Sequence, residues 1–346
     1  MKFEDEIIAN LILSLKQLKG VGNKTILRLL LTKKKELEFT TDYTYDFLND
    51  LGVKDISKGL EKTLISWSDI QKKSSEILEL CYDSEISVLH PYMSDYPSRL
   101  LVNKNFPPIL FCKGNILLLN AKKIVAIIGT RNPTKYGLRM GLRLSELLSE
   151  EGYVITSGLA IGSDTIAHQG ALNKTGKTIA VLATPIDAPV YPKKNIDLAK
   201  EIISKNGVLI SEYPPGTPLN GRELVSNLIA RDEWQSGLSD GVIAIETSVR
   251  GGTNHAIKHA IKTNTPIGIF DYSSRLKEEF FTEYAYSGNV KYIQEKKASP
   301  IFLPESIEKF KIAMAEYNSS LNFIYMPYKL SKTKEKKDIS EQTKLF

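Results

Sequence analysis

Apolar residues between positions 124 and 270 form short continuous runs, and amphipathic stretches separate these runs. The clearest run is Ile124–Ile128, which is mostly β-branched, as expected of a strand buried on both faces. A turn at Gly129-Thr130-Arg131 follows, and apolar positions at helical spacing then predict a helix that ends near Gly152. Tyr153–Thr156 is the next predicted strand. The pattern therefore predicts a βαβ unit around which the chain is organised.

The same alternation continues toward the C-terminus. Further strands are predicted at Thr178–Leu182, Gly207–Glu212, Gly241–Glu246 and Pro266–Phe270. Helices are predicted at 198–205 and 256–261. Strands that alternate with helices favour a parallel sheet with helices on both faces. We therefore expect an α/β fold with an extended Rossmann-like, doubly wound and mainly parallel sheet.

Residues 1–80 are expected to form a separate helical module. Ile7, Leu11 and Leu15 lie at helical spacing, and further helices are expected at 43–51 and 60–80. The turn Gly20-Val21-Gly22 resembles that of a helix-hairpin-helix (SAM-like) motif, in which backbone amides face a DNA phosphate. A plain helix pair in a small bundle explains the same residues, and both interpretations remain open.

Composition shifts divide the rest of the chain. The Rossmann-like domain is expected over 81–303, and its first part, 81–118, contains prolines that suit edge strands or turns. A helical or extended segment is expected over 304–328. Residues 329–346 are polar and basic and are expected to be disordered.

Composition excludes several classes of protein. The net charge of +6 permits a nucleic-acid partner without requiring one. Two cysteines, Cys81 and Cys112, support neither a disulfide framework nor a zinc site, so no metal or other cofactor is expected. No apolar run reaches about 18 residues and no signal-like core is present, which indicates a cytoplasmic protein without a membrane span.

Polar, glycine-rich segments follow the predicted strands, and parallel strands bring such segments to one sheet edge. Five are interpreted as loops, and they begin at Gly129, Ser157, Ser211, Arg231 and Arg250. Small residues allow a backbone to approach a phosphate, and arginines neutralise its charge. The predicted phosphate-binding or nucleic-acid-binding residues are Gly129, Thr130, Arg131, Lys135, Ser157, Gly158, Gly162, Arg231, Arg250, Gly251, Gly252 and Thr253.

Enzymatic chemistry is less well supported by these segments. They match neither the dinucleotide fingerprint GxGxxG nor the P-loop, and no nucleophile with a suitably spaced base is present. His168 could serve as a general base, but a hydrogen-bonded structural histidine is the simpler interpretation. Glu212 and Glu246, at predicted strand ends, are interpreted in the same way as structural support. No catalytic residue is predicted.

The ordered motifs resemble those of the DprA/Smf family of DNA-processing proteins over residues 85–300. The matching motifs include Asp95-Tyr96-Pro97, Gly129-Thr130-Arg131 with Tyr136-Gly137, Ser157-Gly158-Leu159-Ala160, Tyr191-Pro192, Ser211-Glu212-Tyr213-Pro214 and Gly237-Leu238-Ser239. The resemblance implies a Rossmann-like fold and a non-enzymatic protein that binds single-stranded DNA. It also implies a homodimer and a RecA-type recombinase as partner. Arg131 would be a main phosphate contact, with Lys135 beside it.

The chain departs from the family pattern at several positions. The family usually has Arg-Asn-Arg where this chain has Arg231-Asp232-Glu233, and Arg250-Gly251-Gly252-Thr253 replaces a Ser-Gly-Ser/Thr loop. These departures leave a second hypothesis open. In it the protein is a nucleotide-binding enzyme or sensor, with phage defence as one setting, that uses Arg231, Glu233 and Glu246 around a ribose phosphate.

The tail ends in Gln342-Thr343-Lys344-Leu345-Phe346. A glutamine followed by a Leu-Phe pair resembles the peptides by which bacterial proteins dock in the sliding-clamp pocket, where two apolar anchors fill the pocket and the glutamine fixes register. Gln342, Leu345 and Phe346 are therefore candidate clamp-binding residues, although so short a motif also arises by chance.

Overall fold

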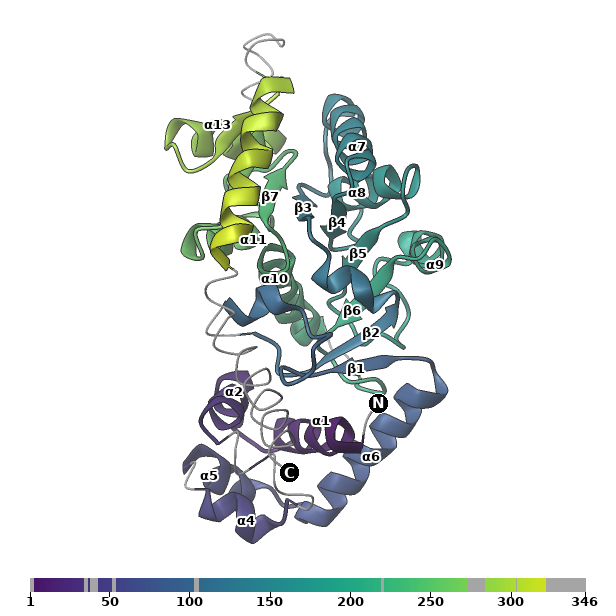
Figure 1. Cartoon of the computed structure of the whole chain (residues 1–346), viewed down its shortest axis with the longest axis vertical. Helices are drawn as coiled ribbons and strands as arrows, with labels where there is room; N and C mark the ends of the chain where they lie inside the picture. The colour runs from purple at the N-terminus through teal and green to yellow at the C-terminus, as the bar shows by residue number, and fades with distance from the viewer. Residues whose placement is uncertain are drawn as a thin grey trace, which may run out of the picture.

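The predicted parallel sheet forms most of a nine-stranded sheet (Figure 1). The protein is represented by a computed structural model that describes residues 3–33, 37, 43–51, 54–102, 106–218, 221–272, 284–302 and 304–321. The strand order is β1-β2-β6-β5-β4-β3-β7-β8-β9. The strands are β1 Ser87–Leu89, β2 Leu110–Gly114, β3 Ile124–Ile128, β4 Val154–Ser157, β5 Thr178–Val181, β6 Val208–Ser211, β7 Gly241–Ala244, β8 Ile267–Phe270 and β9 Ser299–Ile301.

Strands β3 to β9 are parallel to one another, and β2, near one edge, runs antiparallel to both of its neighbours, β1 and β6. Strand β3 pairs with β4 on one side and with β7 on the other. The chain order therefore reverses at β3, and a crevice forms at such a switch point beyond the carboxyl ends of the strands. The predicted fold class is confirmed.

Helices cover both faces of the sheet because the central strands are apolar on both sides. One face, with Val125 and Ile155, packs against α7, α8 and the helix 304–321. The other face, with Ala126 and Ile179, packs against α10 and α11. The helices of this region are α7 Lys135–Glu150, α8 Ser163–Leu172, α9 Ile196–Ser204, α10 Gly221–Gly237, α11 Asn254–Lys262 and α13 Ser287–Gln294, with short η1 Ser98–Val102, η2 Ile116–Asn120, η3 Lys193–Asn195 and η4 Tyr284–Tyr286.

The N-terminal helices lie together below the sheet in Figure 1. They are α1 Phe3–Lys16, α2 Asn23–Thr32, α4 Tyr45–Asp50, α5 Lys54–Lys62 and α6 Trp67–Asp83. The single helix predicted over 60–80 is wrong. The chain breaks between Lys62 and Trp67, where the hydroxyl of Ser66 accepts a hydrogen bond from the amide of Asp69 and caps α6.

The helical module and the sheet share one hydrophobic core, which includes Leu11 of α1, Phe111 of β2 and Ile202 of α9. The turn at Gly20–Gly22 also lies against the α/β region. Asn23, directly after it, donates a hydrogen bond of 3.2 Å to Glu212 Oε2, while Trp234 of α10 donates one of 2.9 Å to Glu212 Oε1. Glu212 therefore links the two regions, in the supporting role expected of it.

The segment 304–328 is helical over 304–321, whereas residues 322–346, with the predicted tail and its clamp motif, lie outside the described residues. The domain boundaries remain predictions. Among the described residues, no helix has the length and apolar character needed to cross a bilayer.

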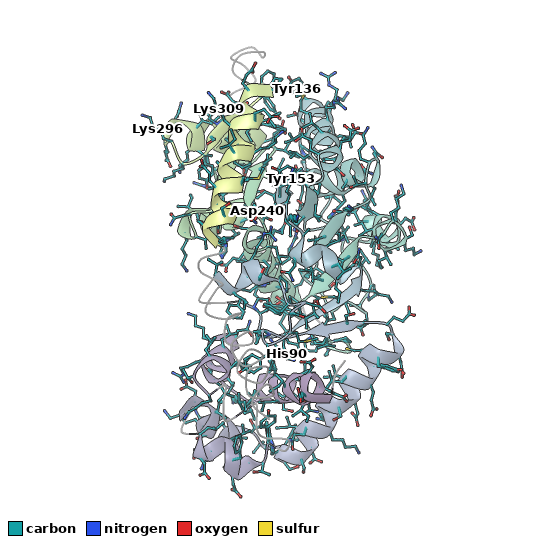
Figure 2. All side chains as sticks on the ribbon, viewed as in Figure 1. His90, Tyr136, Tyr153, Asp240, Lys296 and Lys309 are labelled. Carbon is teal, nitrogen blue, oxygen red and sulfur yellow. The ribbon has the colours of Figure 1, made fainter. Side chains whose placement is uncertain are left out.

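A buried ion pair joins the start of the sheet to the C-terminal helix. Arg99 donates to both carboxylate oxygens of Asp240, at 2.7 and 3.0 Å. The same carboxylate accepts from the amide of Ile124 at 2.9 Å and from Asn318 at 2.6 Å. Figure 2 shows Asp240 beside the helix 304–321. One buried carboxylate thus connects four parts of the chain, and its polar atoms are well satisfied.

Removing one partner of this pair leaves an uncompensated buried charge. We expect Arg99→Ala to destabilise the protein by about 3–5 kcal/mol in chemical denaturation. Arg28→Ala is the matched control, because Arg28 also pairs with an aspartate, Asp55, but both side chains are about half exposed, at 54% and 49%. The control substitution should lower the free energy of unfolding by less than about 1 kcal/mol. Equal losses in the two variants would contradict the role assigned to Asp240.

Candidate functional site

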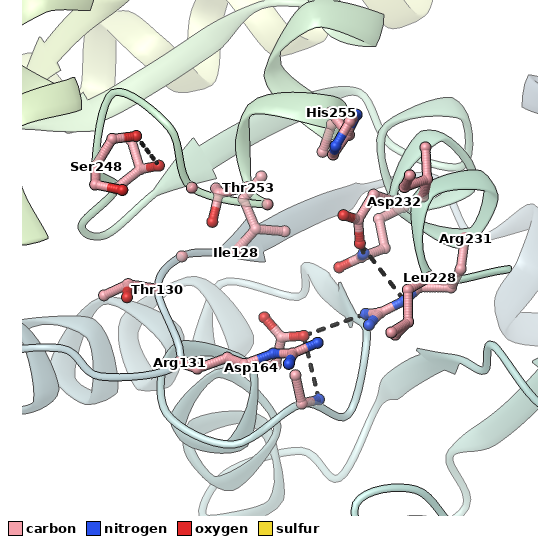
Figure 3. A pocket seen from close by; sticks show the side chains of 18 of the residues that line it. Ile128, Thr130, Arg131, Asp164, Leu228, Arg231, Asp232, Ser248, Thr253 and His255 are labelled. Atoms are coloured by element: carbon pink, nitrogen blue, oxygen red, sulfur yellow. Dashed lines mark hydrogen bonds and ion pairs between the residues drawn. The ribbon is translucent and has the colours of Figure 1, made fainter. Parts of the chain in front are cut away.

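A pocket of about 500 Å³ opens at the switch point of the sheet (Figure 3). The end of β3, the turn after it, the loops after β4 and β7, and the helices α10 and α11 supply its walls. The residues that line it are Ile128, Gly129, Thr130, Arg131, Ala160, Asp164, Val225, Leu228, Ile229, Arg231, Asp232, Gln235, Thr247, Ser248, Gly251, Gly252, Thr253, His255 and Ala256. Its size suits a nucleotide unit rather than a water molecule or an ion.

The turn after β3 is fixed from two sides. The amide of Thr130 donates to the carbonyl of Glu246 at 2.7 Å, and Ser163 donates to the carbonyl of Thr130 through both its amide and its hydroxyl. Gly129 is required here, because a Cβ at that position would lie 2.4 Å from Ser163 Oγ. The turn is therefore held in one place before any ligand arrives, which lowers the entropy cost of binding.

The carboxylate of Glu246, fully buried after β7, holds the start of α7. Its two oxygens accept hydrogen bonds of 2.7 Å from the amide and from the hydroxyl of Thr134, which caps the helix. A carboxylate at a helix N-terminus is favoured by the helix dipole. Glu246 thus lies behind the turn and supports it, as its interpretation from the sequence proposed, and it does not line the pocket.

An arginine is buried at the floor of the pocket, between two aspartates (Figure 3). Arg231 on α10 donates to Asp164 Oδ2 at 3.3 Å, and its Nε lies 3.5 Å from Asp232 Oδ1. Its Nη1 occupies the space beside Gly158, only 1.0 Å from where a Cβ would be placed. Gly158 therefore acts by making room for the guanidinium.

Burial dominates the ionisation of the two aspartates. It raises the pKa of Asp232 to about 6, although Arg231 and Arg131 oppose this rise. Burial also raises the pKa of Asp164 above its usual value, against the neighbouring Arg231 charge and hydrogen bonds from Ala160 and Ser157. Arg231 is itself only 4% exposed and is paired with both aspartates, so its positive charge is less available to a ligand than that of an exposed arginine.

Exposed cations occur on the turn after β3, at the start of α7 and in the loop after β7. Arg131 is exposed, lines the pocket, and also lines a smaller adjacent cavity of about 70 Å³ with Tyr191 and Gly158. Lys135 and Arg250 are exposed as well, but they do not line the pocket. Arg131 is thus the cation placed best to meet an anion at this site.

The loop after β7 brings Gly251, Gly252 and Thr253 to the wall from which α11 begins. No atom lies within 4 Å of the position of a Cβ on Gly252, and the Thr253 side chain makes no capping hydrogen bond. A helix start of this kind favours an anion. The predicted residues Gly129, Thr130, Arg131, Arg231, Gly251, Gly252 and Thr253 therefore line one cavity.

Other predicted residues take supporting positions. The Ser157 hydroxyl is buried 2.7 Å from the carbonyl of Ile127 and also contacts Asp164, so it supports the pocket from behind and does not line it. Gly162 has a φ of +81°, and a Cβ there would lie 2.4 Å from the carbonyl oxygen of Arg131. His168 is buried 2.7 Å from the Thr178 hydroxyl, and burial lowers its pKa to about 3. It has the structural role that the sequence favoured.

The loop predicted at Arg231 is wrong, because residues 221–237 form the helix α10. Only one face of this helix reaches the pocket, and Glu233 does not lie on it. The sequence interpretation missed the pocket residues Val225, Leu228, Ile229, Asp232 and Gln235. These residues are separated from one another by three, four or seven positions, the spacing of one helix face, and this spacing in the sequence could have predicted a helix here.

Comparison with known proteins agrees with this geometry. The family described as DNA recombination-mediator protein A matches residues 87–311, well over half of the chain. The chain belongs to this family. It is 37% identical over 180 residues to the DNA processing protein DprA of Streptococcus pneumoniae, covering 52% of this chain and 56% of the relative. It is 36% identical over 158 residues to the protein Smf of Escherichia coli, and this match covers 46% of the present chain and 41% of the relative. The chain thus spans about half the length of the curated relatives it matches.

Solved structures of family members extend the likeness beyond the matched segment. The X-ray structure of DprA from Streptococcus pneumoniae superimposes on this protein with a TM-score of 0.67 and 27% sequence identity. The match covers 89% of the present chain and 98% of the Streptococcus pneumoniae chain. The structure of DNA processing protein A from Helicobacter pylori matches with a TM-score of 0.55 and 28% sequence identity. This match covers 67% of the present chain and 97% of the Helicobacter pylori chain. The pocket therefore lies within the region that characterises the family.

Gly158→Ala tests the packing of the buried arginine. We expect the added methyl group to displace the guanidinium of Arg231 from Asp164 and to cost about 1–3 kcal/mol of unfolding free energy. Gly252→Ala, on the same pocket wall but in open space, should change stability by less than about 0.5 kcal/mol. Chemical denaturation measures both. A neutral Gly158→Ala would show that Arg231 is not held as described.

Proposed function

We propose that the protein binds single-stranded DNA at the switch-point edge of its sheet and acts without catalysis in recombination or DNA uptake. The observation that carries this proposal is the position of Arg131. This exposed cation lines both the main pocket and the adjacent small cavity. One side chain can therefore bind a backbone phosphate while neighbouring bases enter the spaces on either side.

The apolar surface around the pocket supports a single-stranded ligand. Tyr191, Val225 and Ile229 are exposed, at 45%, 60% and 38%, and all three line one of the two cavities. Unpaired bases stack on aromatic and apolar side chains, whereas paired bases are hidden within a duplex. Family membership also supports this ligand, since the structure from Helicobacter pylori is described in terms of a single-stranded DNA binding mode.

The finer parts of the proposal concern partners. We extend it to a homodimer that protects single-stranded DNA and helps a RecA-type recombinase to load. Membership of a family described as recombination mediators supports this partner.

The nucleotide-enzyme hypothesis receives less support from the geometry. It requires Arg231, Glu233 and Glu246 around one ribose phosphate. Glu246 is bound to Thr134 behind the turn, Glu233 does not line the pocket, and Arg231 is paired with Asp164. These groups do not converge on one ligand, and the family match does not favour this hypothesis either.

Arg131→Ala tests the DNA site. With a fluorescent dT20 oligonucleotide at low salt, we expect the variant to bind about five- to tenfold more weakly in an anisotropy titration. Because one phosphate contact is lost, the slope of log K against log salt should fall in magnitude by about 0.7.

Arg143→Ala is the matched control for this titration, since Arg143 is an exposed arginine farther along α7, with a side chain 64% exposed. It should bind dT20 as the wild type does. Absence of binding by the wild type at low salt, or equal losses in both variants, would contradict the proposed site.

For the tail we propose docking to a sliding clamp through Gln342, Leu345 and Phe346. Deleting residues 342–346 is expected to abolish binding to a purified bacterial clamp in a calorimetric titration, because both apolar anchors are lost. A variant with alanine only at Thr343 and Lys344 keeps the anchors and should still bind. Equal clamp affinity of the full chain and the deletion would disprove this docking.

A further inference from the structure

Two arginines and two aspartates line the pocket. Arg231 donates to Asp164 Oδ2 at 3.3 Å, and its Nε lies 3.5 Å from Asp232 Oδ1, so two carboxylates share one guanidinium. Arg131 acts electrostatically on Asp232 as well. Figure 3 shows Arg231 and Asp232 on α10, with Arg131 and Asp164 below them in the view. While both aspartates are ionised, the two positive and two negative charges cancel. Neutralising one aspartate leaves an excess of positive charge to attract an anion.

Asp232 is the less compensated of the two carboxylates. Asp164 accepts hydrogen bonds from Arg231 and, at 3.2 Å, from the amide of Ala160, and only 7% of its side chain is exposed. Asp232 accepts a hydrogen bond of 3.0 Å from Gln235, whereas the Nε of Arg231 lies near it without forming a hydrogen bond. Its side chain is 18% exposed and can exchange a proton with solvent. Asp232 is therefore the carboxylate that is neutralised more easily.

The ionisation of Asp232 responds to a bound phosphate. Burial raises the pKa of Asp232 to about 6, Asp164 adds to this rise, and Arg231, Arg131 and the hydrogen bond from Gln235 oppose it. A phosphate at Arg131 brings a negative charge nearby and offsets the positive charge of that arginine, and both effects favour the neutral carboxyl group. The DNA complex therefore holds more protons at this group than the free protein does. By linkage, the affinity for DNA rises as the pH falls through the range in which Asp232 titrates.

We infer that Asp232 opposes the binding of DNA at Arg131, and that its carboxylate takes up a proton from solvent when DNA binds. The inference rests on the proposed DNA site and adds to it a dependence on pH. It requires no contact between Asp232 and the ligand, because the charges act across the pocket. Phosphate binding alone makes the affinity depend on salt but involves no proton, so coupling to a proton is a distinct property.

Histidines titrate in a similar pH range and must be distinguished from Asp232. Of the four in the chain, His255 on α11 lines the pocket, whereas His90, His168 and His259 do not. Burial lowers the pKa of His168 to about 3 and that of His259 to about 4, so both stay neutral where Asp232 titrates. A protonated His255 would also attract an anion, and a variant at this position is therefore part of the test.

Anisotropy titrations with fluorescent dT20 measure the pH dependence at constant ionic strength. We expect the wild type to bind dT20 about five- to tenfold more tightly at about pH 5 than at about pH 8. Thymine has no group that titrates in this range, so the change in affinity reports on the protein.

Proton uptake is measured directly by calorimetric titration of the wild type with dT20, at a pH where Asp232 is partly ionised. Two buffers with different enthalpies of ionisation should give different apparent binding enthalpies, because the buffer supplies the proton that the complex takes up. This measurement requires no variant, so it tests the coupling even where a substitution impairs folding.

Asp232→Asn removes the charge and keeps an oxygen for the hydrogen bond from Gln235, while Arg231 keeps Asp164 as its partner. We expect this variant to bind dT20 at about pH 8 as tightly as the wild type does at about pH 5, with less than about twofold change between them. Its binding enthalpy should no longer depend on the buffer. Thermal unfolding checks that the variant is folded.

Two matched controls accompany it. Glu233→Gln removes the same charge from the next residue of α10, which does not line the pocket, and should keep the wild-type pH dependence. His255→Gln removes the other titratable group of the pocket and should also keep it. A pH dependence that survives Asp232→Asn and disappears in His255→Gln would overturn the role of Asp232.

The remaining outcomes separate this inference from the proposed function. Wild-type affinity that is sensitive to Arg131→Ala but independent of pH, without proton uptake, would overturn the coupling and leave the DNA site intact. Weaker binding by Asp232→Asn at every pH would show that the carboxylate assists binding, contrary to the inference. Failure of the wild type to bind dT20 at any pH would overturn the proposed function, and the coupling with it.

Discussion

The switch point of the sheet depends on one buried carboxylate. Glu246, at the end of β7, accepts two hydrogen bonds from Thr134, and its backbone carbonyl accepts one from Thr130. These contacts join the turn after β3 to the end of β7 across the crevice. They fix the turn that carries Arg131 relative to the end of β7, from which the loop of Gly251 and Gly252 begins. The shape of the pocket thus depends in part on a residue that does not line it.

The two arginines of the pocket, Arg231 and Arg131, have different roles. Arg231 neutralises part of a buried pair of aspartates, while Arg131 is exposed and available. Desolvation makes a second unpaired charge at the floor costly, which accounts for the raised pKa of both aspartates. The rim of the pocket therefore carries an available positive charge, whereas the arginine at its floor is paired with aspartates.

The sequence predicted the fold well because buried parallel strands have a simple signature. The run Ile124–Ile128 and its successors are continuous and apolar, and they recur between helices.

The sequence predicted the pocket only in part. Glycines and arginines after strands identified Arg131 and Gly251, but α10 has mixed polarity along its exposed face, and residues 231–237 were interpreted as a loop. The role of Ser157 was also hidden, since a serine in a loop and one bonded to a neighbouring strand look alike in sequence.

The link at Glu212 joins the pocket to the N-terminal helices. Trp234 lies two residues beyond Asp232 on α10 and donates a hydrogen bond to Glu212. Asn23, the first residue of α2, donates to the other oxygen of the same carboxylate. The family match begins only at residue 87, so Asn23 lies outside the matched segment. Asn23 and Trp234 share one carboxylate, so the N-terminal module is joined through a single side chain to the helix that lines the pocket.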